Sequence, residues 1–146
     1  MVRPQFPDYG AFLSWPAEGH GWIHADDVSR VRQLIPSNRV FRRDAFDGLF
    51  YHYRYGHSTF RLRPCLWLPL SWEGFNIGDH VETIGLSLQR ELFLARIVEM
   101  HYERYKNRIV YRLKRRSHTI PRNFTAHEIR LCRARGLPAR EVAKRS

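Results

Sequence analysis

The sequence has few cysteines and no long apolar run. Its two cysteines, Cys65 and Cys132, are far apart and lack metal-ligand spacing, so we expect two reduced thiols rather than a disulfide framework. No apolar stretch approaches the length that spans a bilayer, and the N-terminal MVRPQFPDYG has no signal-peptide core. We therefore predict a soluble, cytoplasmic protein that makes no membrane contact.

Recognisable catalytic motifs are also missing. The sequence has no Ser/His/Asp order, phosphate-binding loop or dinucleotide fingerprint, and its eight histidines are scattered. We therefore predict a protein that is not an enzyme and has no cofactor. Catalytic groups are often distant in sequence, so an undetected enzyme stays as a third hypothesis. A pocket gathering several of His24, Asp26, His52 and Glu99 would support it.

Acidic residues are scarce in the last third of the chain. Residues 1–103 carry 11 Lys and Arg against 12 Asp and Glu, whereas residues 104–146 carry 14 against 2. Such asymmetry indicates an end that faces a polyanion. The competing interpretation is a merely solvated basic surface, because a GC-rich genome raises the Arg content everywhere. That bias does not by itself remove acids from one third of a chain.

The length and composition suit one compact domain. The chain has 146 residues, 43% of them hydrophobic, and it contains no repeats, low-complexity tract or flexible linker. We predict a single domain over residues 1–146 of the α+β class, mainly β. Within it, residues 1–73 form an α+β part, residues 74–131 form a small barrel on which that part packs, and residues 132–146 form a basic tail.

The N-terminal part contains one predicted helix among short strands. Residues 1–21 are rich in Pro, Gly and aromatics, which predicts an ordered but irregular arm. Asp26 and Asp27 open a short helix that runs to about Leu34, since carboxylates favour a helix start. Alternating patterns predict strands over residues 40–44, 49–55 and 59–63, and two prolines mark residues 65–70 as an edge strand or a kink.

The stretch from Gly74 to Leu131 has the clearest plan. Alternation predicts strands over residues 81–84, 92–102 and 108–114, with a turn at Lys106-Asn107 and a break at Pro121-Arg122-Asn123. Met100 stays on the buried face of the second strand only if a β-bulge lies near Val98-Glu99. A helix over residues 92–105 is the alternative, because good helix formers are frequent there.

The residues at regular strand positions in this stretch resemble those of Src-homology-3-like and Tudor-like barrels. The pattern consists of Phe75, Ile77-Gly78-Asp79, Val81, Ala95, Ile97, Tyr111, Leu113 and Phe124. The resemblance implies a small barrel that binds a ligand, although the fold alone does not choose among nucleic acid, methylated side chains and Pro-rich peptides. Only Tyr102 and Tyr105 are candidates for a methyl-lysine cage.

Most of residues 20–131 also resembles an uncharacterised family of bacterial proteins. The segments WIHADD, LIPSNRVFRRD, YGHSTFRLRPCLW and GFNIGDHVE carry this resemblance through their Pro, Trp and Gly-Asp positions. It implies no known activity.

The tail is predicted to be helical. Thr125 and Glu128 have the spacing of a capping box, and Gly136 is a suitable C-terminal stop. A second helix would open at Leu137. We therefore expect a basic C-terminal helical segment.

Basic and aromatic residues alternate around the predicted turn at Lys106-Asn107 and beyond it. Positive charge suits phosphates and aromatic faces suit bases, so this group predicts a surface for nucleic acid or another polyanion with weak sequence specificity. An acidic protein partner is the alternative. The predicted contact residues are Tyr102, Arg104, Tyr105, Lys106, Arg108, Arg112, Lys114, Arg115, Arg116 and Arg122.

Two groups of His and acidic residues have the chemistry of a metal or acid/base site. One is His24 with Asp26 and Asp27, where a helix start already requires the carboxylates. The other is Glu99, His101 and Glu103, where an exposed polar strand face is the simpler interpretation. We therefore predict no metal site.

Overall fold

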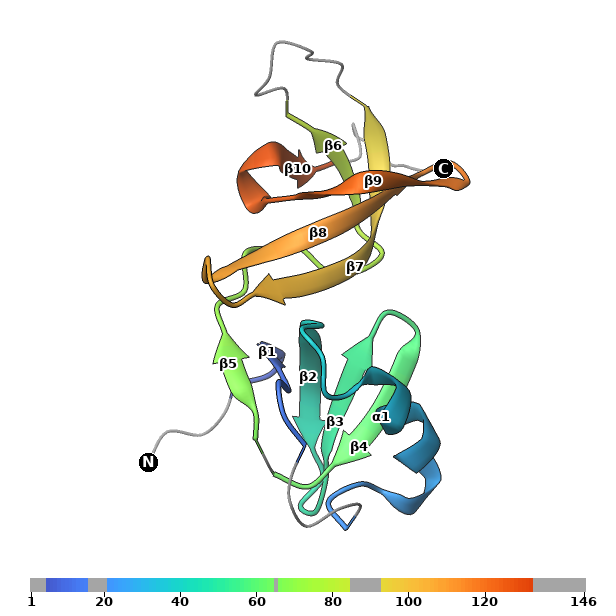
Figure 1. The fold of residues 1–146 in the computed structure, drawn as a ribbon. Coiled ribbons are helices and arrows are strands. Elements are labelled where there is room, and N and C mark those ends of the chain that lie inside the picture. The colour runs from blue at the N-terminus through green and yellow to red at the C-terminus, as the bar shows by residue number, and fades with distance from the viewer. Residues whose placement is uncertain (1–4, 16–20, 65, 85–92, 133–146) are drawn as a thin grey trace. The chain divides into compact units, whose positions relative to one another are not determined.

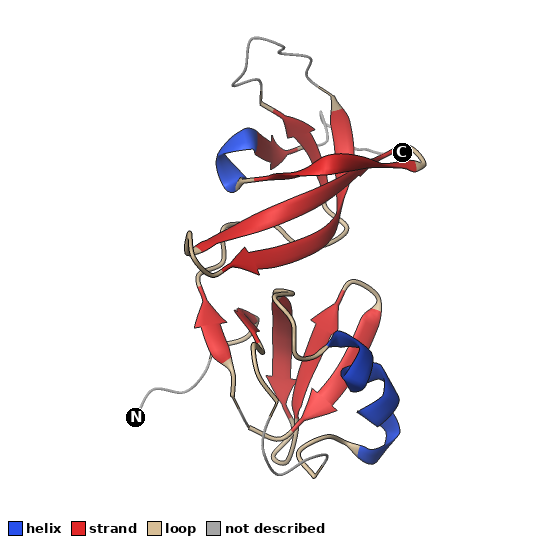
Figure 2. Cartoon of the chain, viewed as in Figure 1, coloured by secondary structure: helices blue, strands red, loops and turns tan. Residues whose placement is uncertain are grey.

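The computed structural model describes residues 5–15, 21–64, 66–84 and 93–132, which form two antiparallel five-stranded sheets (Figures 1 and 2). One short helix, α1 (Val28–Leu34), follows the 3₁₀ turn η1 (Ala25–Asp27). The predicted mainly β composition and the short N-terminal helix are therefore confirmed. Within the described ranges, no helix has the length and apolar content needed to cross a membrane.

The contacts of the chain fall into two compact units. The first contains residues 1–74 and 100–109, and the second contains residues 75–99 and 110–146. Strands β7 (Leu94–Glu103) and β8 (Arg108–Arg115) each have residues in both units. The single domain over residues 1–146 stays a prediction.

The sheet of the first unit has the order β4-β3-β2-β1-β5. Its strands are β1 (Asp8–Ala11), β2 (Phe41–Phe46), β3 (Tyr51–Tyr55), β4 (Ser58–Leu62) and β5 (Leu68–Leu70). Strands β2, β3 and β4 lie where the alternation in the sequence predicts strands. Strand β5 contains Pro69 and lies at the edge of the sheet, as predicted, because a proline cannot donate a ladder hydrogen bond.

The predicted irregular arm is wrong for residues 8–11. They form β1, which lies between β2 and β5 inside the sheet. Gly10 permits this position, because a Cβ there would lie only 2.5 Å from the Leu68 carbonyl oxygen and 2.6 Å from the Trp67 ring. Four residues that include a glycine give too little alternation to reveal a strand.

Helix α1 helps to cover the core of the first unit. Its residue Val31 and the following Ile35 are buried, and Val28 and Leu34 pack against the same cluster, so these four residues form the apolar side of the helix. Aromatic rings dominate this core. Its buried members are Phe12, Trp22, Ile23, Val31, Ile35, Phe41, Tyr53, Phe60 and Leu62.

The sheet of the second unit is open. Its order is β10-β6-β7-β8-β9, and the described strands include no pairing of β9 with β10. The new elements are β6 (His80–Thr83), β9 (His118–Phe124) and β10 (Ile129–Leu131). The described residues thus form no closed barrel, and the predicted Src-homology-3-like or Tudor-like barrel is not confirmed. Local alternation fixes strands but does not determine whether the outer two pair with each other.

Strands β7 and β8 confirm the strand interpretation over the helical alternative. Ile109, Tyr111 and Leu113 are buried on one side of β8. Val110, on the opposite side of the strand, is also buried, so the polar side of β8 begins at Arg112.

The predicted β-bulge near Val98-Glu99 is not needed to explain the burial in β7. Ala95 and Ile97 are buried in the second unit and Met100 in the first, so the pattern changes where the strand changes unit. The bulge itself stays a prediction.

The C-terminal elements differ from the prediction in two places. Residues 121–123 do not break the sheet but belong to β9, with a register irregularity opposite Arg112 and Lys114. The capping box of Thr125 and Glu128 is present, but it opens only the 3₁₀ turn η2 (Ala126–Glu128). Strand β10 then begins at Ile129, which is buried and pairs with Thr83. The predicted stop at Gly136 and the second helix lie outside the described residues.

Candidate nucleic-acid interface

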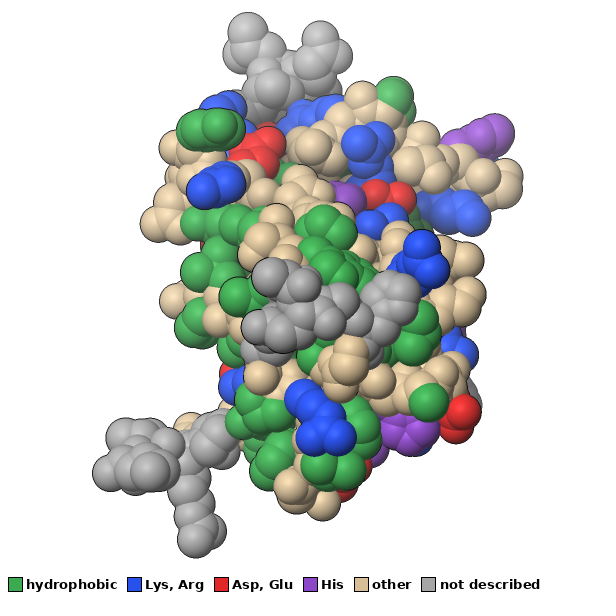
Figure 3. All heavy atoms as spheres, turned by 60° about the horizontal axis from the view of Figure 1, so that its bottom comes forward, with side chains coloured by type: hydrophobic (Ala, Val, Ile, Leu, Met, Phe, Trp, Pro, Cys, Tyr) green, Lys and Arg blue, Asp and Glu red, His purple; other side chains and the backbone are tan. Residues whose placement is uncertain are grey.

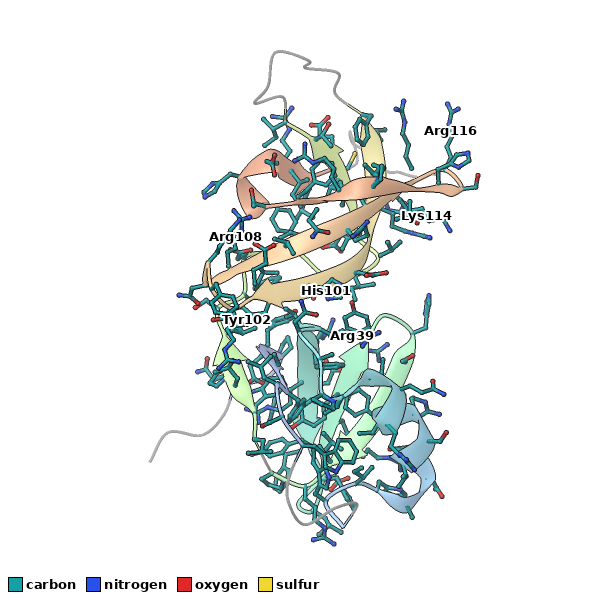
Figure 4. The ribbon with its side chains drawn as sticks, viewed as in Figure 1. Arg39, His101, Tyr102, Arg108, Lys114 and Arg116 are labelled. Atoms are coloured by element: carbon teal, nitrogen blue, oxygen red, sulfur yellow. The ribbon has the colours of Figure 1, made fainter. Side chains whose placement is uncertain are left out.

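The ten predicted contact residues divide between the two units. Tyr102, Arg104, Tyr105, Lys106 and Arg108 belong to the first unit, and Arg112, Lys114, Arg115, Arg116 and Arg122 belong to the second. Tyr102 and Arg108 flank the turn between β7 and β8, and Lys114 and Arg116 lie at the turn between β8 and β9 (Figure 4), whereas Arg112 and Arg122 lie within β8 and β9. Figure 3 likewise shows Lys and Arg side chains at several separate places on one face.

The turn between β7 and β8 presents one free aromatic ring. Tyr105 at its tip is 100% exposed, and Arg104 and Lys106 beside it are exposed. Tyr102 is half-buried, and its hydroxyl donates to Asn107 Oδ1 at 2.8 Å. Arg108 Nε donates to Glu103 Oε1 at 2.6 Å, which neutralises much of its charge. Arg104, Tyr105 and Lys106, which we term the aromatic tip, therefore stay available to a ligand.

The hairpin between β8 and β9 carries the denser charge. Arg115 pairs with His118, so Arg116 and Ser117 form a two-residue turn, and Lys114 pairs with Thr119. The Arg115 guanidinium lies 4.9 Å from the centre of the Phe93 ring. Within the described ranges, no ion pair joins Lys114, Arg115 or Arg116 to a carboxylate. These three residues are the basic hairpin end.

Arg116 adopts a backbone conformation that is unusual for its residue type. Its φ is 57°, in the left-handed region that glycine and asparagine prefer. Asn107, in the turn at the other end of β8, has a φ of 49° and is the expected type of residue for it. Position 116 therefore carries a basic side chain although its backbone conformation would suit glycine or asparagine better.

Two of the predicted contact residues are engaged in the fold. Arg112 is half-buried, donates to the Ile120 carbonyl at 3.5 Å, and has a buried Nε without an acceptor among the described residues. Arg122 donates to Glu128 and stacks 4.0 Å from the Phe124 ring centre. Burial raises the pKa of Glu128, but hydrogen bonds from Thr125 and Arg122 outweigh burial and lower the pKa overall. Both arginines therefore serve the local structure.

The two groups with metal-site chemistry serve the fold as well. His24 Nδ1 accepts a hydrogen bond from the Asp26 main chain, and Asp27 is buried against Arg61. Glu99 and His101 lie two residues apart on β7, and His101 Nδ1 is 2.9 Å from Asn38 Oδ1. Among the residues that the structure describes, no three His, Cys, Asp or Glu side chains are placed to hold a metal ion.

Sequence reasoning missed a charged pocket in the first unit. This pocket, of about 570 Å³, is lined by Asp26, Asp27, Arg30, Asp44, Ala45, His52, Tyr53, Arg54, Thr59, Phe60 and Arg61. It gathers Asp26 and His52 from the group that would support an enzyme, but not His24 or Glu99. The charged residues at alternate positions of β2, β3 and β4 could have indicated this pocket, because strand pairing places them side by side.

Comparison with known proteins identifies a family for this chain. No curated protein and no solved structure matches the chain significantly. A model of a family of unknown function, DUF6960, matches residues 1–130. This agrees with the resemblance to an uncharacterised family, and its coverage extends through both sheets. The chain therefore belongs to the DUF6960 family, whose function is unknown.

Proposed function

We propose that this protein binds the phosphate backbone of nucleic acid with little sequence specificity, through the basic hairpin end. Lys114, Arg115 and Arg116 are consecutive residues at an exposed turn, and within the described residues none of them is paired with a carboxylate. Cations in this state can release counterions from phosphates on binding, which is the main source of non-specific affinity for nucleic acid.

The observation that carries the proposal is the left-handed backbone of Arg116. A residue other than Gly, Asn or Asp in this region costs about 1–2 kcal/mol. An Arg in this turn despite the cost favours a role for the guanidinium itself, because strained positions concentrate at functional sites. A solvated basic surface would not need an arginine at that position.

The aromatic tip of the first unit favours single-stranded over double-stranded nucleic acid as the ligand. The Tyr105 ring is fully exposed, and Arg104 and Lys106 flank it. An exposed ring between cations can stack on a base while the cations contact phosphates, and stacking contributes about 1–3 kcal/mol per base. Such contacts do not distinguish bases, because every base has a flat face and every nucleotide a phosphate.

Fluorescence anisotropy with labelled single- and double-stranded oligonucleotides across a salt series tests the proposal. The Arg115→Glu/Arg116→Glu variant should lose affinity and show a lower salt slope, by about 0.7 to 0.9 for each lost phosphate contact. The matched control, Arg32→Glu/Arg63→Glu, makes the same charge change at exposed positions of the first unit and should bind nearly as the wild type. The hairpin variant keeps Arg112, because reversal of this half-buried charge would disturb the fold.

Four outcomes are informative. A steep salt dependence that the hairpin variant alone reduces supports the proposal. Equal losses in both variants would indicate a diffuse effect of net charge and contradict the assignment to the hairpin. No binding at low salt would exclude nucleic acid, and retention of a single acidic protein after nuclease treatment would favour the protein-interaction alternative.

A further inference from the structure

The charged pocket of the first unit lies on the polar face of β2, β3 and β4, beside η1 and α1. In the register of these strands, Arg42 pairs with Arg54, His52 with Arg61, and Arg54 with Thr59. Antiparallel pairs project to the same side, so the polar side chains of three strands form one surface. Asp26, Asp27 and Arg30 complete the pocket. Its volume, about 570 Å³, falls in the range of small-molecule sites.

Each of two carboxylates at this pocket is shared by two guanidinium groups. Asp27 accepts from Arg30 Nη1 at 3.3 Å and from Arg61 Nε at 2.9 Å. Asp44 accepts from Arg42 Nε at 2.6 Å and from Arg54 Nε at 3.3 Å. Arg42 lies outside the pocket lining, so within it Arg30, Arg54 and Arg61 face Asp26, Asp27 and Asp44.

Several guanidinium donors are left over by these pairs. Arg54 uses only Nε, and Arg30 uses only Nη1, which also donates to the Thr59 carbonyl at 2.6 Å. Arg61 uses Nε and Nη2. Their other N–H groups have no acceptor in the part of the chain that the structure describes, and the three side chains are 34–46% exposed. The pocket thus offers fork-shaped donors from α1, β3 and β4.

We propose that this pocket binds the phosphate group of a phosphorylated small molecule. Guanidinium groups recognise phosphate through paired N–H donors, and several forks from different directions suit its tetrahedral oxygens better than the two oxygens of a carboxylate. The Thr59 hydroxyl at the pocket wall adds a further polar group for the ligand. This site is separate from the basic hairpin end and does not depend on the proposed binding of nucleic acid.

Asp26 opposes the ligand and provides a test of the electrostatics. Its side chain is 80% exposed at the pocket, and the nearer carboxylate oxygen lies 4.0 Å from His24 Nδ1. Unlike Asp27 and Asp44, it is not shared by two arginines. Replacing this carboxylate with a neutral amide removes repulsion from the phosphate, so Asp26→Asn should bind phosphate more tightly.

Isothermal titration of the full chain with inorganic phosphate, glucose 6-phosphate and glucose, at constant ionic strength, tests the proposal. The two phosphates should bind saturably and glucose should not. Arg54→Gln should weaken phosphate binding about tenfold, the effect of losing charge-assisted hydrogen bonds. Arg42→Gln is the matched control, because Arg42 binds the same Asp44 carboxylate but does not line the pocket.

The variants separate phosphate binding at the pocket from damage to the sheet and from binding at the hairpin. Unchanged binding by Arg42→Gln and Arg115→Glu/Arg116→Glu, together with tighter binding by Asp26→Asn, supports the proposal, since misfolding cannot produce a gain. Equal losses in Arg54→Gln and Arg42→Gln would overturn it and indicate that the arginines only support the sheet. The absence of saturable binding of both phosphates would also overturn it, as would loss of binding in the hairpin variant alone.

Discussion

Replacement of Arg116 by glycine should stabilise the protein and weaken its binding of nucleic acid at the same time. The φ of 57° costs an arginine about 1–2 kcal/mol, a cost that glycine does not have. The greater freedom of glycine in the unfolded chain offsets about 0.5–1 kcal/mol of this gain. The expected net stabilisation is therefore about 0.5–1 kcal/mol, or about 2–4 °C in Tm for a chain of this length.

The loss of binding follows from the removed charge. One phosphate contact fewer should lower the slope of the salt dependence by about 0.7 on single-stranded DNA. Thermal melting and fluorescence anisotropy of the same preparations measure the two effects. Arg116→Lys is the control, because lysine keeps the charge and the unfavourable φ, and it should leave both stability and binding close to wild type. A glycine variant that is less stable, or that binds as tightly as wild type, would refute the reasoning.

Three further predictions concern the fold. Asp27→Asn should cost about 2–3 kcal/mol in urea unfolding at pH 7, because it breaks a largely buried ion pair whose arginine partners are partly exposed. Burial raises the pKa of Asp27, but hydrogen bonds and charge from Arg61 lower the pKa overall. The stability that the Asp27 carboxylate contributes is therefore lost as the pH falls through its folded-state pKa. The difference in unfolding free energy between Asp27→Asn and wild type should shrink in acid. Gly10→Ala should destabilise β1 by about 1–3 kcal/mol, through overpacking against Leu68 and Trp67, with altered tryptophan fluorescence. Thr125→Ala should cost about 1 kcal/mol in thermal melts by removing the capping box.

The sequence predicts strands well where the alternation is long and one side is buried. Tyr111 and Leu113 in β8 illustrate this, because five or more residues repeat the same pattern. Prediction from the sequence fails where pairing with a distant strand determines which element a segment forms. The capping box at Thr125 suggests a helix, but Ile129 gains more from burial and pairing with Thr83 than from another helical turn.

The candidate site shows the same limit. Charge alone identifies residues 114–116 as candidate contacts, and the structure adds that they lie at a two-residue turn. The division of the ten residues between two units could not be predicted, because nothing in the composition of β7 changes at Met100. The charged pocket was missed because its residues are spread over several elements and meet only through strand register.

The discontinuous first unit also restricts the order in which the chain can fold during synthesis. Met100 donates its N–H to the Tyr55 hydroxyl and accepts from Val40 N, and Tyr102 N donates to Asn38 O, so these bonds join residues 45 to 64 positions apart. A ribosome must release residues up to about 109 before this unit can close, by which time most of the sheet strands have emerged. Any fragment that ends before residue 100 therefore lacks part of both units, and limited proteolysis between the units should not yield a native half.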